Sequence, residues 1–227
     1  MKLRYPVFKV LSCVSALFLA AVSVGSLHAA EPYEVVTSSW LGGEDGDEVR
    51  GMSIAPDGSI YLVAQVQGDV PWAGTPALLA GATESSGGIY MHLDATGRTV
   101  LAYARVADEV FHLDTDAAGH PYIGTDTGLI KLNPADTSVL WVVRPDLQLR
   151  DVDVAPSGLV AARQSSNTHI FDADGSNERI IPNYRSTFDI ALDEARQVLY
   201  QIGWRQSNSG CNPVQISYLR AVDFEGN

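Results

Sequence analysis

A repeat of 39 residues is the feature of this sequence that most restricts its fold. Four short segments hold a common register, and each follows an alternating apolar stretch that ends in a polar turn. The last residues of these segments are separated by 61, 39 and 39 positions along the chain. The segments are Ser59–Tyr61, His120–Tyr122, Leu159–Ala161 and Val198–Tyr200.

An independent landmark keeps the same spacing. Leu93, Leu132 and Phe171 each precede an Asp or an Asn, and they follow one another at intervals of 39 residues. Val222 is a fourth member after an insertion. Two landmarks on one period identify a repeat protein, in which each unit buries its faces against its neighbours.

Each repeat is predicted to contain four antiparallel strands. Val, Ile and Tyr alternate with polar residues between turn clusters, and the sequence after residue 31 has no helical periodicity. Four short strands per repeat are typical of a propeller blade. We therefore predict an all-β fold, a β-propeller with about four blades of four antiparallel strands, and a solenoid is the main alternative. The predicted turns lie at Pro56–Gly58, Asp116–Gly119, Pro156–Gly158 and Glu194–Arg196.

The two ends of the repeat region predict an incomplete ring. Glu34–Trp40 aligns with the fourth strand of a repeat, and Asp223–Asn227 aligns with the turn that precedes a fourth strand. Four blades alone would make a very small ring, so we expect residues 31–227 to be a fragment of a six- to eight-bladed propeller. The end blades should then expose faces that favour self-association. Insertions at residues 65–88 and 207–213 are expected in surface loops.

Residues 1–30 have the pattern of a secretory signal peptide. Three basic residues precede a short apolar run, which ends in small residues at Ala29 and Ala30. Removal of this segment leaves 12 of the 15 basic and all 27 acidic residues, a net charge of −15. Such a surface repels nucleic acid and anionic lipid. We expect a secreted, periplasmic or cell-surface protein with no nucleic-acid partner and no membrane insertion after signal removal, in which Cys211 has no internal disulfide partner.

The first repeat resembles a known family of bacterial propeller repeats. A Leu-Gly-Gly segment at residues 39–43, an acidic pair within residues 46–54 and an Asp-Gly hairpin at residues 57–62 precede the strand at residues 88–94. This order is similar to that of the SBBP repeat family, and the later repeats resemble a more general NHL-like pattern. The resemblance implies an exported propeller, and it implies no defined activity and no catalytic residues.

The repeat register also selects candidate site residues. Five polar residues occupy related positions on the first strands of successive blades, which lie innermost in a propeller: His112, Asp114, Asp151, Asp153 and Asp189. Converging carboxylates and an imidazole can hold a metal ion or polarise water. The alternative is that these groups only hydrate the wall of the central channel. Asp172–Glu178 has oxygen donors at alternate positions and is a second candidate for calcium, although a hairpin turn explains it equally well.

Binding rather than catalysis is the function that this sequence favours. It contains no Gly-x-Ser-x-Gly elbow, His-Glu-x-x-His pair, Cys-x-x-Cys pair or phosphate-binding loop. We expect an exported scaffold that binds a protein or glycan through its face loops, with no assigned cofactor and with calcium or another divalent metal as the open possibility. The alternative is a metal-dependent hydrolase or lactonase. A quinoprotein-like oxidoreductase is a third possibility, which is weakened because the four tryptophans do not share one repeat position. Tyr61, Tyr122 and Tyr200 do share one, and we expect them to pack between blades.

Overall fold

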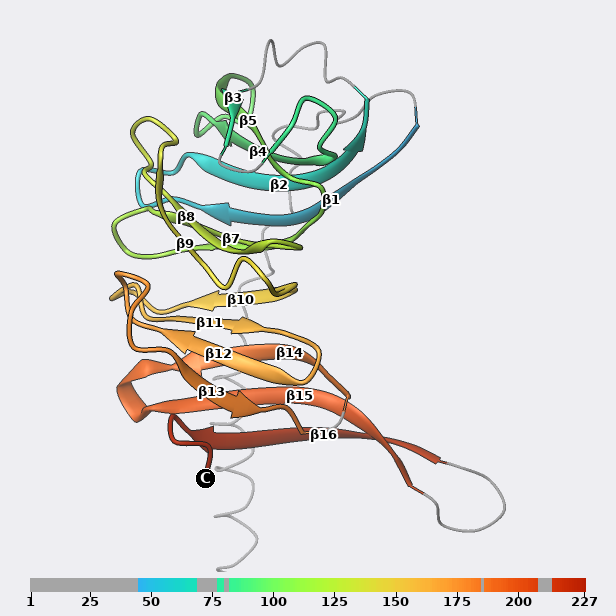
Figure 1. The fold of residues 1–227 in the computed structure, drawn as a ribbon. Helices are drawn as coiled ribbons and strands as arrows, with labels where there is room; N and C mark the ends of the chain where they lie inside the picture. The colour runs from blue at the N-terminus through green and yellow to red at the C-terminus, as the bar shows by residue number, and fades with distance from the viewer. Residues whose placement is uncertain (1–44, 69–76, 80–81, 185, 208–213) are drawn as a thin grey trace, which may run out of the picture. The chain divides into compact units, whose positions relative to one another are not determined.

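Strands connected by short turns make up nearly all of the described chain. The computed structural model describes residues 45–68, 77–79, 82–184, 186–207 and 214–227, all within the unit Ser39–Asn227. These residues form four sheets that follow one another in chain order, from blue to red in Figure 1. Within the described residues, the one helical element is the single-turn 3-10 helix η3 (Glu194–Arg196). No helix in this part of the chain is long and apolar enough to cross a membrane.

The first and second sheets are antiparallel meanders, apart from one added edge strand. The first sheet has the order β1-β2-β4-β5-β3, and β3 pairs with β5 in parallel. Its strands are β1 (Asp45–Ile54), β2 (Ile60–Gln67), β3 (Ala77–Leu78), β4 (Gly88–Leu93) and β5 (Val100–Ala107). The second sheet has the order β6-β7-β8-β9 and comprises β6 (Val110–Thr115), β7 (Pro121–Thr125), β8 (Gly128–Leu132) and β9 (Val139–Val143).

The third and fourth sheets repeat the same meander. The third sheet comprises β10 (Asp151–Val154), β11 (Val160–Arg163), β12 (Asn167–Phe171) and β13 (Arg179–Pro182). The described strands of the fourth sheet are β14 (Ser186–Asp193), β15 (Val198–Ser207) and β16 (Val214–Asp223). The predicted all-β fold of antiparallel four-stranded units is therefore confirmed. The insertion after β2 is not entirely loop, because it contributes β3 to the edge of the first sheet.

The four predicted turns connect the first and second strands of each sheet. In the first three sheets a glycine in the left-handed region ends the turn, with φ of 85° at Gly58, 82° at Gly119 and 91° at Gly158. The fourth sheet has no glycine at this place, and its turn forms as η3 with Gln197 in the left-handed region at φ 55°. The turn thus keeps its position in the repeat without a glycine, although the left-handed backbone conformation is less favourable for Gln197 than for glycine.

The core lies between neighbouring sheets. Tyr61 and Val63 of the first sheet pack with Leu113 and Ile123 of the second in one buried cluster. Tyr122 and Leu129 of the second sheet pack with Val152, Val160 and Phe171 of the third. Ala161, Ile170 and Ile181 of the third sheet pack with Ile190 and Leu199 of the fourth. Each fully buried Leu, Ile or Val contributes about 1.5–3 kcal/mol, so sheet stacking supplies the main stabilisation.

Several sequence predictions fall outside the described residues. These are the signal peptide at residues 1–30, the closing strand at Glu34–Trp40 and the segment around Cys211. They remain predictions.

Candidate functional site

Three of the predicted inner-strand acids link the second sheet to the third and the third sheet to the fourth. The backbone N–H of Val154 on β10 donates to Asp114 Oδ2 on β6 at 2.8 Å. One sheet further on, the N–H of Ile190 on β14 donates to Asp151 Oδ2 at 2.9 Å. The N–H of Leu192 donates to the carboxylate of Asp153 in the same way. In each case a carboxylate accepts a hydrogen bond from a backbone N–H of the first strand of the next sheet.

His112 and Asp189 occupy the two ends of this series. The Nδ1 atom of His112 lies 2.9 Å from the carbonyl oxygen of Val152 and 3.2 Å from its amide nitrogen. It also lies 3.5 Å from Asp151 Oδ1. Asp189 is exposed on β14 and accepts a hydrogen bond from the next N–H of its own strand, that of Ile190, at 2.9 Å. The structure thus brings His112 and Asp151 together.

Burial raises the pKa of the inner-strand carboxyl groups. The pKa of Asp151 is raised to about 6, chiefly by burial; His112 opposes the rise, the charge of Asp189 adds to it, and Arg163 opposes it. Burial likewise raises the pKa of Asp114 and of Asp153. Arg163 Nε lies 3.8 Å from Asp151 Oδ2, and its guanidinium also donates to the Thr187 carbonyl at 3.2 Å.

Three of the inner-strand carboxylates, those of Asp114, Asp151 and Asp153, act as cross-links between sheets in this arrangement. Among the described residues, no three His, Cys, Asp or Glu side chains are placed so that they could hold one metal ion. Asp172, in the second calcium candidate, accepts from Asn177 Nδ2 at 2.7 Å and from Arg179 at 2.9 Å. That segment forms the hairpin turn between β12 and β13, closed by a hydrogen bond from Gly175 N–H to the Asp172 carbonyl.

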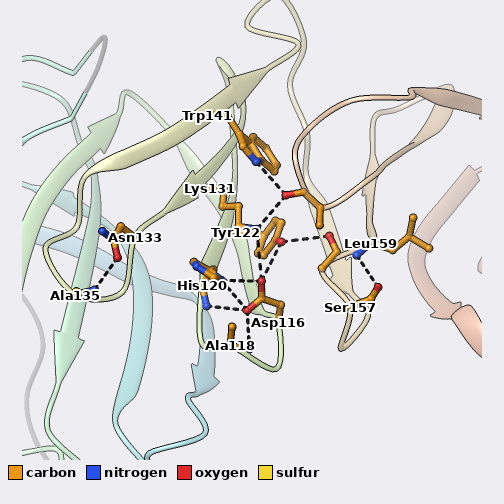
Figure 2. Close-up of polar contacts among 12 residues, drawn as sticks. Asp116, Ala118, His120, Tyr122, Lys131, Asn133, Ala135, Trp141, Ser157 and Leu159 are labelled. Atoms are coloured by element: carbon orange, nitrogen blue, oxygen red, sulfur yellow. Dashed lines mark hydrogen bonds and ion pairs between the residues drawn. The ribbon is translucent and has the colours of Figure 1, made fainter.

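A second polar cluster, which we call the Asp116 cluster, joins the second and third sheets (Figure 2). Asp116 is buried at the start of the β6–β7 turn, and its carboxylate accepts from the N–H groups of Ala118 at 3.0 Å and His120 at 2.9 Å. His120 Nδ1 lies 2.9 Å from the same carboxylate, and the Tyr122 hydroxyl donates to it at 3.2 Å. Burial alone would raise the pKa of Asp116, but the hydrogen bonds from His120 and the charges of His120 and Lys131 hold it below its usual value.

The Asp116 cluster ends on carbonyl groups of the third sheet. The Tyr122 hydroxyl lies 3.2 Å from the Gly158 carbonyl oxygen. Lys131 Nζ, itself buried, donates to the Ala173 carbonyl at 3.0 Å and lies 3.5 Å from Asp116. Trp141 Nε1 donates to the same Ala173 carbonyl at 3.2 Å. A buried ammonium with a carboxylate, a carbonyl and the Tyr122 ring at 4.7 Å is well compensated, so this cluster fixes one sheet on the other.

A pocket of about 330 Å³ opens on the turn side of the first and second sheets. Its walls are three turns: Ala55–Asp57 after β1, Ala117–Gly119 after β6, and Pro134–Ala135 after β8. Tyr61 and His92 form its inner end, with their rings edge to face and 4.5 Å between centroids. The Asn133 side chain fixes the third wall by accepting the Ala135 N–H at 3.1 Å (Figure 2).

His92 is the chemically unusual residue of this pocket. Its Nε2 atom is buried and has no hydrogen-bond partner in the described part of the chain. Burial lowers the pKa of His92, while the Asp57 carboxylate opposes that change. The imidazole is therefore favoured in its neutral form.

Sequence reasoning did not identify Arg163, the Asp116 cluster or His92. Two signals were present. Arg163 pairs directly opposite Asp151 across the β10–β11 hairpin, which follows from counting outwards from the turn at residues 156–158. Lys131 lies within the apolar strand Gly128–Leu132, and a charge inside a buried strand requires a partner. The contact of His92 with the pocket depends on how two sheets pack, for which the sequence carries no direct signal.

The fold and its sheet-to-sheet contacts define a β-propeller, and solved structures of that class are similar to it. Tricorn protease matches with a TM-score of 0.50 at 10% identity, over 77% of this chain and 18% of that one. The Neurospora crassa Pan2 WD40 domain matches with a TM-score of 0.48 at 11% identity, over 68% and 46%. A gluconolactonase of Xanthomonas campestris matches with a TM-score of 0.46 at 18% identity, over 72% and 58%. The chain thus spans less than two thirds of each of these proteins.

Comparison of the sequence with protein families and with curated proteins does not assign the chain to a family. No family model matches the chain, and no curated protein matches it. The resemblance of the first repeat to SBBP repeats therefore remains a prediction, whereas the propeller fold is confirmed.

Proposed function

We propose that this protein is an exported propeller scaffold that binds a segment of another protein at the pocket between its first two sheets. One observation carries the proposal: the carboxylates on β6 and β10 are used to hold the next sheet in place. Groups used in this way make a rigid support, and they are poorly suited to bind and release a substrate. The residues that line the pocket, in contrast, take no part in these carboxylate bonds.

The shape and chemistry of the pocket favour a side chain over a sugar. Its walls are alanine, proline and glycine, which suit a small apolar group. Sugars commonly stack on an exposed aromatic face, but the Tyr61 ring is only 2% exposed. The polar ends of the pocket are the exposed Asp57 carboxylate and the half-buried His92. A short peptide with an apolar group beside a hydroxyl or ammonium group fits this combination, and the net negative charge of the chain favours basic partners.

A selection of random peptides displayed on phage against the immobilised protein tests the proposal. The discriminating variant is Ala118→Trp, which fills the pocket from an exposed turn position without removing a cross-link. Ala195→Trp is the matched control, because Ala195 is the exposed alanine of the corresponding turn in the fourth sheet. Selected peptides should bind the control like the wild type and bind Ala118→Trp at least about tenfold more weakly. Two results would reject the proposal. One is that the peptides bind Ala118→Trp as tightly as the wild type, and the other is that the protein binds oligosaccharides of a test panel but selects no peptides.

A further inference from the structure

The last strands of the first three sheets differ in how their outer edges are protected. An open strand edge presents backbone N–H and C=O groups that can pair with another strand. In the first sheet β3 pairs with β5 at Ala104 and Arg105, so the chain itself covers part of this edge. In the third sheet β13 carries Arg179 and ends at Pro182, whose carbonyl accepts from Arg220 at 3.3 Å. Charge and proline at an edge both oppose the addition of a strand.

The last strand of the second sheet has none of these protections. β9 reads Val-Leu-Trp-Val-Val over residues 139–143, with no charge and no proline, and among the described strands it pairs with β8 alone. The side chains of Leu140 and Val142 are 48% and 37% exposed. The second sheet packs against both the first and the third, so this exposure does not depend on further repeats.

β9 begins beside the pocket between the first two sheets. The turn that precedes it, residues 133–138, supplies Pro134 and Ala135 to the pocket wall. Val142 pairs opposite Ile130, which packs against the first sheet, so Val142 lies on the same side of the second sheet as the pocket. A chain that leaves the pocket past Pro134 and Ala135 therefore meets the exposed side of β9.

Charge indicates the kind of segment that suits this edge. Asp136 is exposed before β9, and Arg144 after β9 lies 3.6 Å from Glu178 and 3.5 Å from Asp146. The two ends of the strand are thus net acidic, as is the whole chain with its formal charge of −12. This charge disfavours a second copy of the chain and favours a segment with basic flanks.

We propose that β9 binds an extended segment of the partner protein as an added strand, and that this segment is apolar with Lys or Arg on both sides. The segment is the one that fills the pocket in the proposed function, so its continuation along β9 rests on that function. Backbone hydrogen bonds to β9 would hold segments of many sequences, whereas the pocket, Leu140 and Val142 select among side chains. β3 shows that the equivalent edge of the first sheet accepts a short extended segment.

A synthetic peptide of alternating valine and threonine, with a pair of lysines at each end, is the probe for the full chain. It should bind, and the same peptide with glutamates in place of the lysines should bind at least about tenfold more weakly. Binding should also slow hydrogen exchange of the β9 amides that point away from β8 by at least about tenfold, and leave the amides of β13 unchanged.

Two variants of the edge test which surface the lysine peptide uses. Leu140→Lys and Val142→Lys place a cation on the exposed side of β9, and each should weaken binding at least about tenfold. The matched control is Leu101→Lys, because Leu101 occupies the repeat position of Leu140 on β5 and is 55% exposed. It should bind like the wild type. All three side chains are exposed, and thermal melts should show that each variant folds.

Ala118→Trp separates the added strand from the pocket. Weaker binding by Ala118→Trp but not by Leu140→Lys or Val142→Lys would refute the added strand and leave the pocket as the peptide site. The reverse result would keep the added strand and refute the pocket. A lysine peptide that does not bind would overturn the added strand. A twofold mass of the free chain that Leu140→Lys removes would also overturn it, because a second copy then occupies the edge.

Discussion

Asp114 on β6 accepts a hydrogen bond at 2.8 Å from the backbone N–H of Val154 on β10, 40 residues further along the chain. The same relationship joins Asp151 to Ile190 and Asp153 to Leu192. In the first sheet Ser53 has the corresponding position, and its hydroxyl lies 2.8 Å from that of Thr115. On β1, β6 and β10, a polar side chain therefore contacts the next sheet one residue beyond the position equivalent to its own.

Removal of this acceptor should destabilise the protein in a specific way. Asp114→Ala leaves the Val154 N–H without its partner at a partly buried position, which should cost about 1–3 kcal/mol of unfolding free energy. Asp114→Asn keeps an oxygen acceptor and should recover most of that loss. Urea denaturation measures both. Asp146→Ala, at a side chain that is 65% exposed, is the control and should change stability by less than about 0.5 kcal/mol. Equal losses for Asp114→Ala and Asp114→Asn would contradict the cross-link.

Asp151 should make stability fall as pH rises. Its pKa is raised to about 6 in the folded chain by burial, against roughly 3.9 for an unfolded aspartate. The folded state therefore holds this proton more tightly, and the stabilisation is fully present below about pH 3.9 and lost by about pH 6. Asp151→Asn removes this dependence while it keeps an oxygen that accepts the Ile190 N–H. The variant should thus gain about 3 kcal/mol relative to the wild type between about pH 4 and pH 8. If the unfolding free energies of the two proteins changed in parallel with pH, the raised pKa of Asp151 would be refuted.

The repeat predicted the sheets, their turns and the strands that carry the polar residues, because period, alternation and turn chemistry are local properties of the sequence. The repeat did not predict what Asp114, Asp151 and Asp153 contact. These contacts depend on an offset of about one residue between the first strands of neighbouring sheets, and this offset arises from how the sheets pack. Arg163 was within reach of sequence reasoning, since hairpin pairing places it opposite Asp151. The pocket at His92 was not, because three separate turns form it.

Divalent metal ions should leave the protein unchanged if the inner-strand groups are cross-links. Addition of calcium or zinc chloride to the full chain should not shift its melting temperature. A metal ion bound at about a hundred times its dissociation constant would add roughly 2.7 kcal/mol, which a thermal melt detects easily. A rise that Asp151→Asn abolishes, together with metal-dependent hydrolysis of a simple lactone, would favour the hydrolase alternative over the scaffold.

Export should remove the first thirty residues. A basic start, a short apolar run and small residues at Ala29 and Ala30 predict cleavage at this point. Mass spectrometry of the protein recovered outside the cytoplasm should identify an N-terminus at Ala30 or Glu31. An intact Met1 in that material would contradict the predicted processing.

The close approach of the second and third sheets at the Asp116 cluster should make Gly158 much more sensitive to substitution than Gly58. Both glycines end the same turn in their own sheets, with φ of 91° and 85°, so alanine at either position pays a similar backbone strain of about 1–2 kcal/mol. The surroundings differ. A Cβ atom at Gly158 would lie 2.8 Å from the Tyr122 hydroxyl and 2.9 Å from Ala173 Cβ, whereas at Gly58 the nearest atom is Ala95 Cβ at 3.5 Å.

Gly158→Ala should therefore lower the unfolding free energy by about 1–3 kcal/mol more than Gly58→Ala, because it also forces the second and third sheets apart. Urea denaturation of the two variants gives this difference directly, with the shared strain cancelled. Combining Gly158→Ala with Tyr122→Phe removes the hydroxyl that the new methyl group would meet, and should recover part of the loss. Equal destabilisation of the two glycine variants would show that the third sheet does not pack against Tyr122 as closely as this geometry requires.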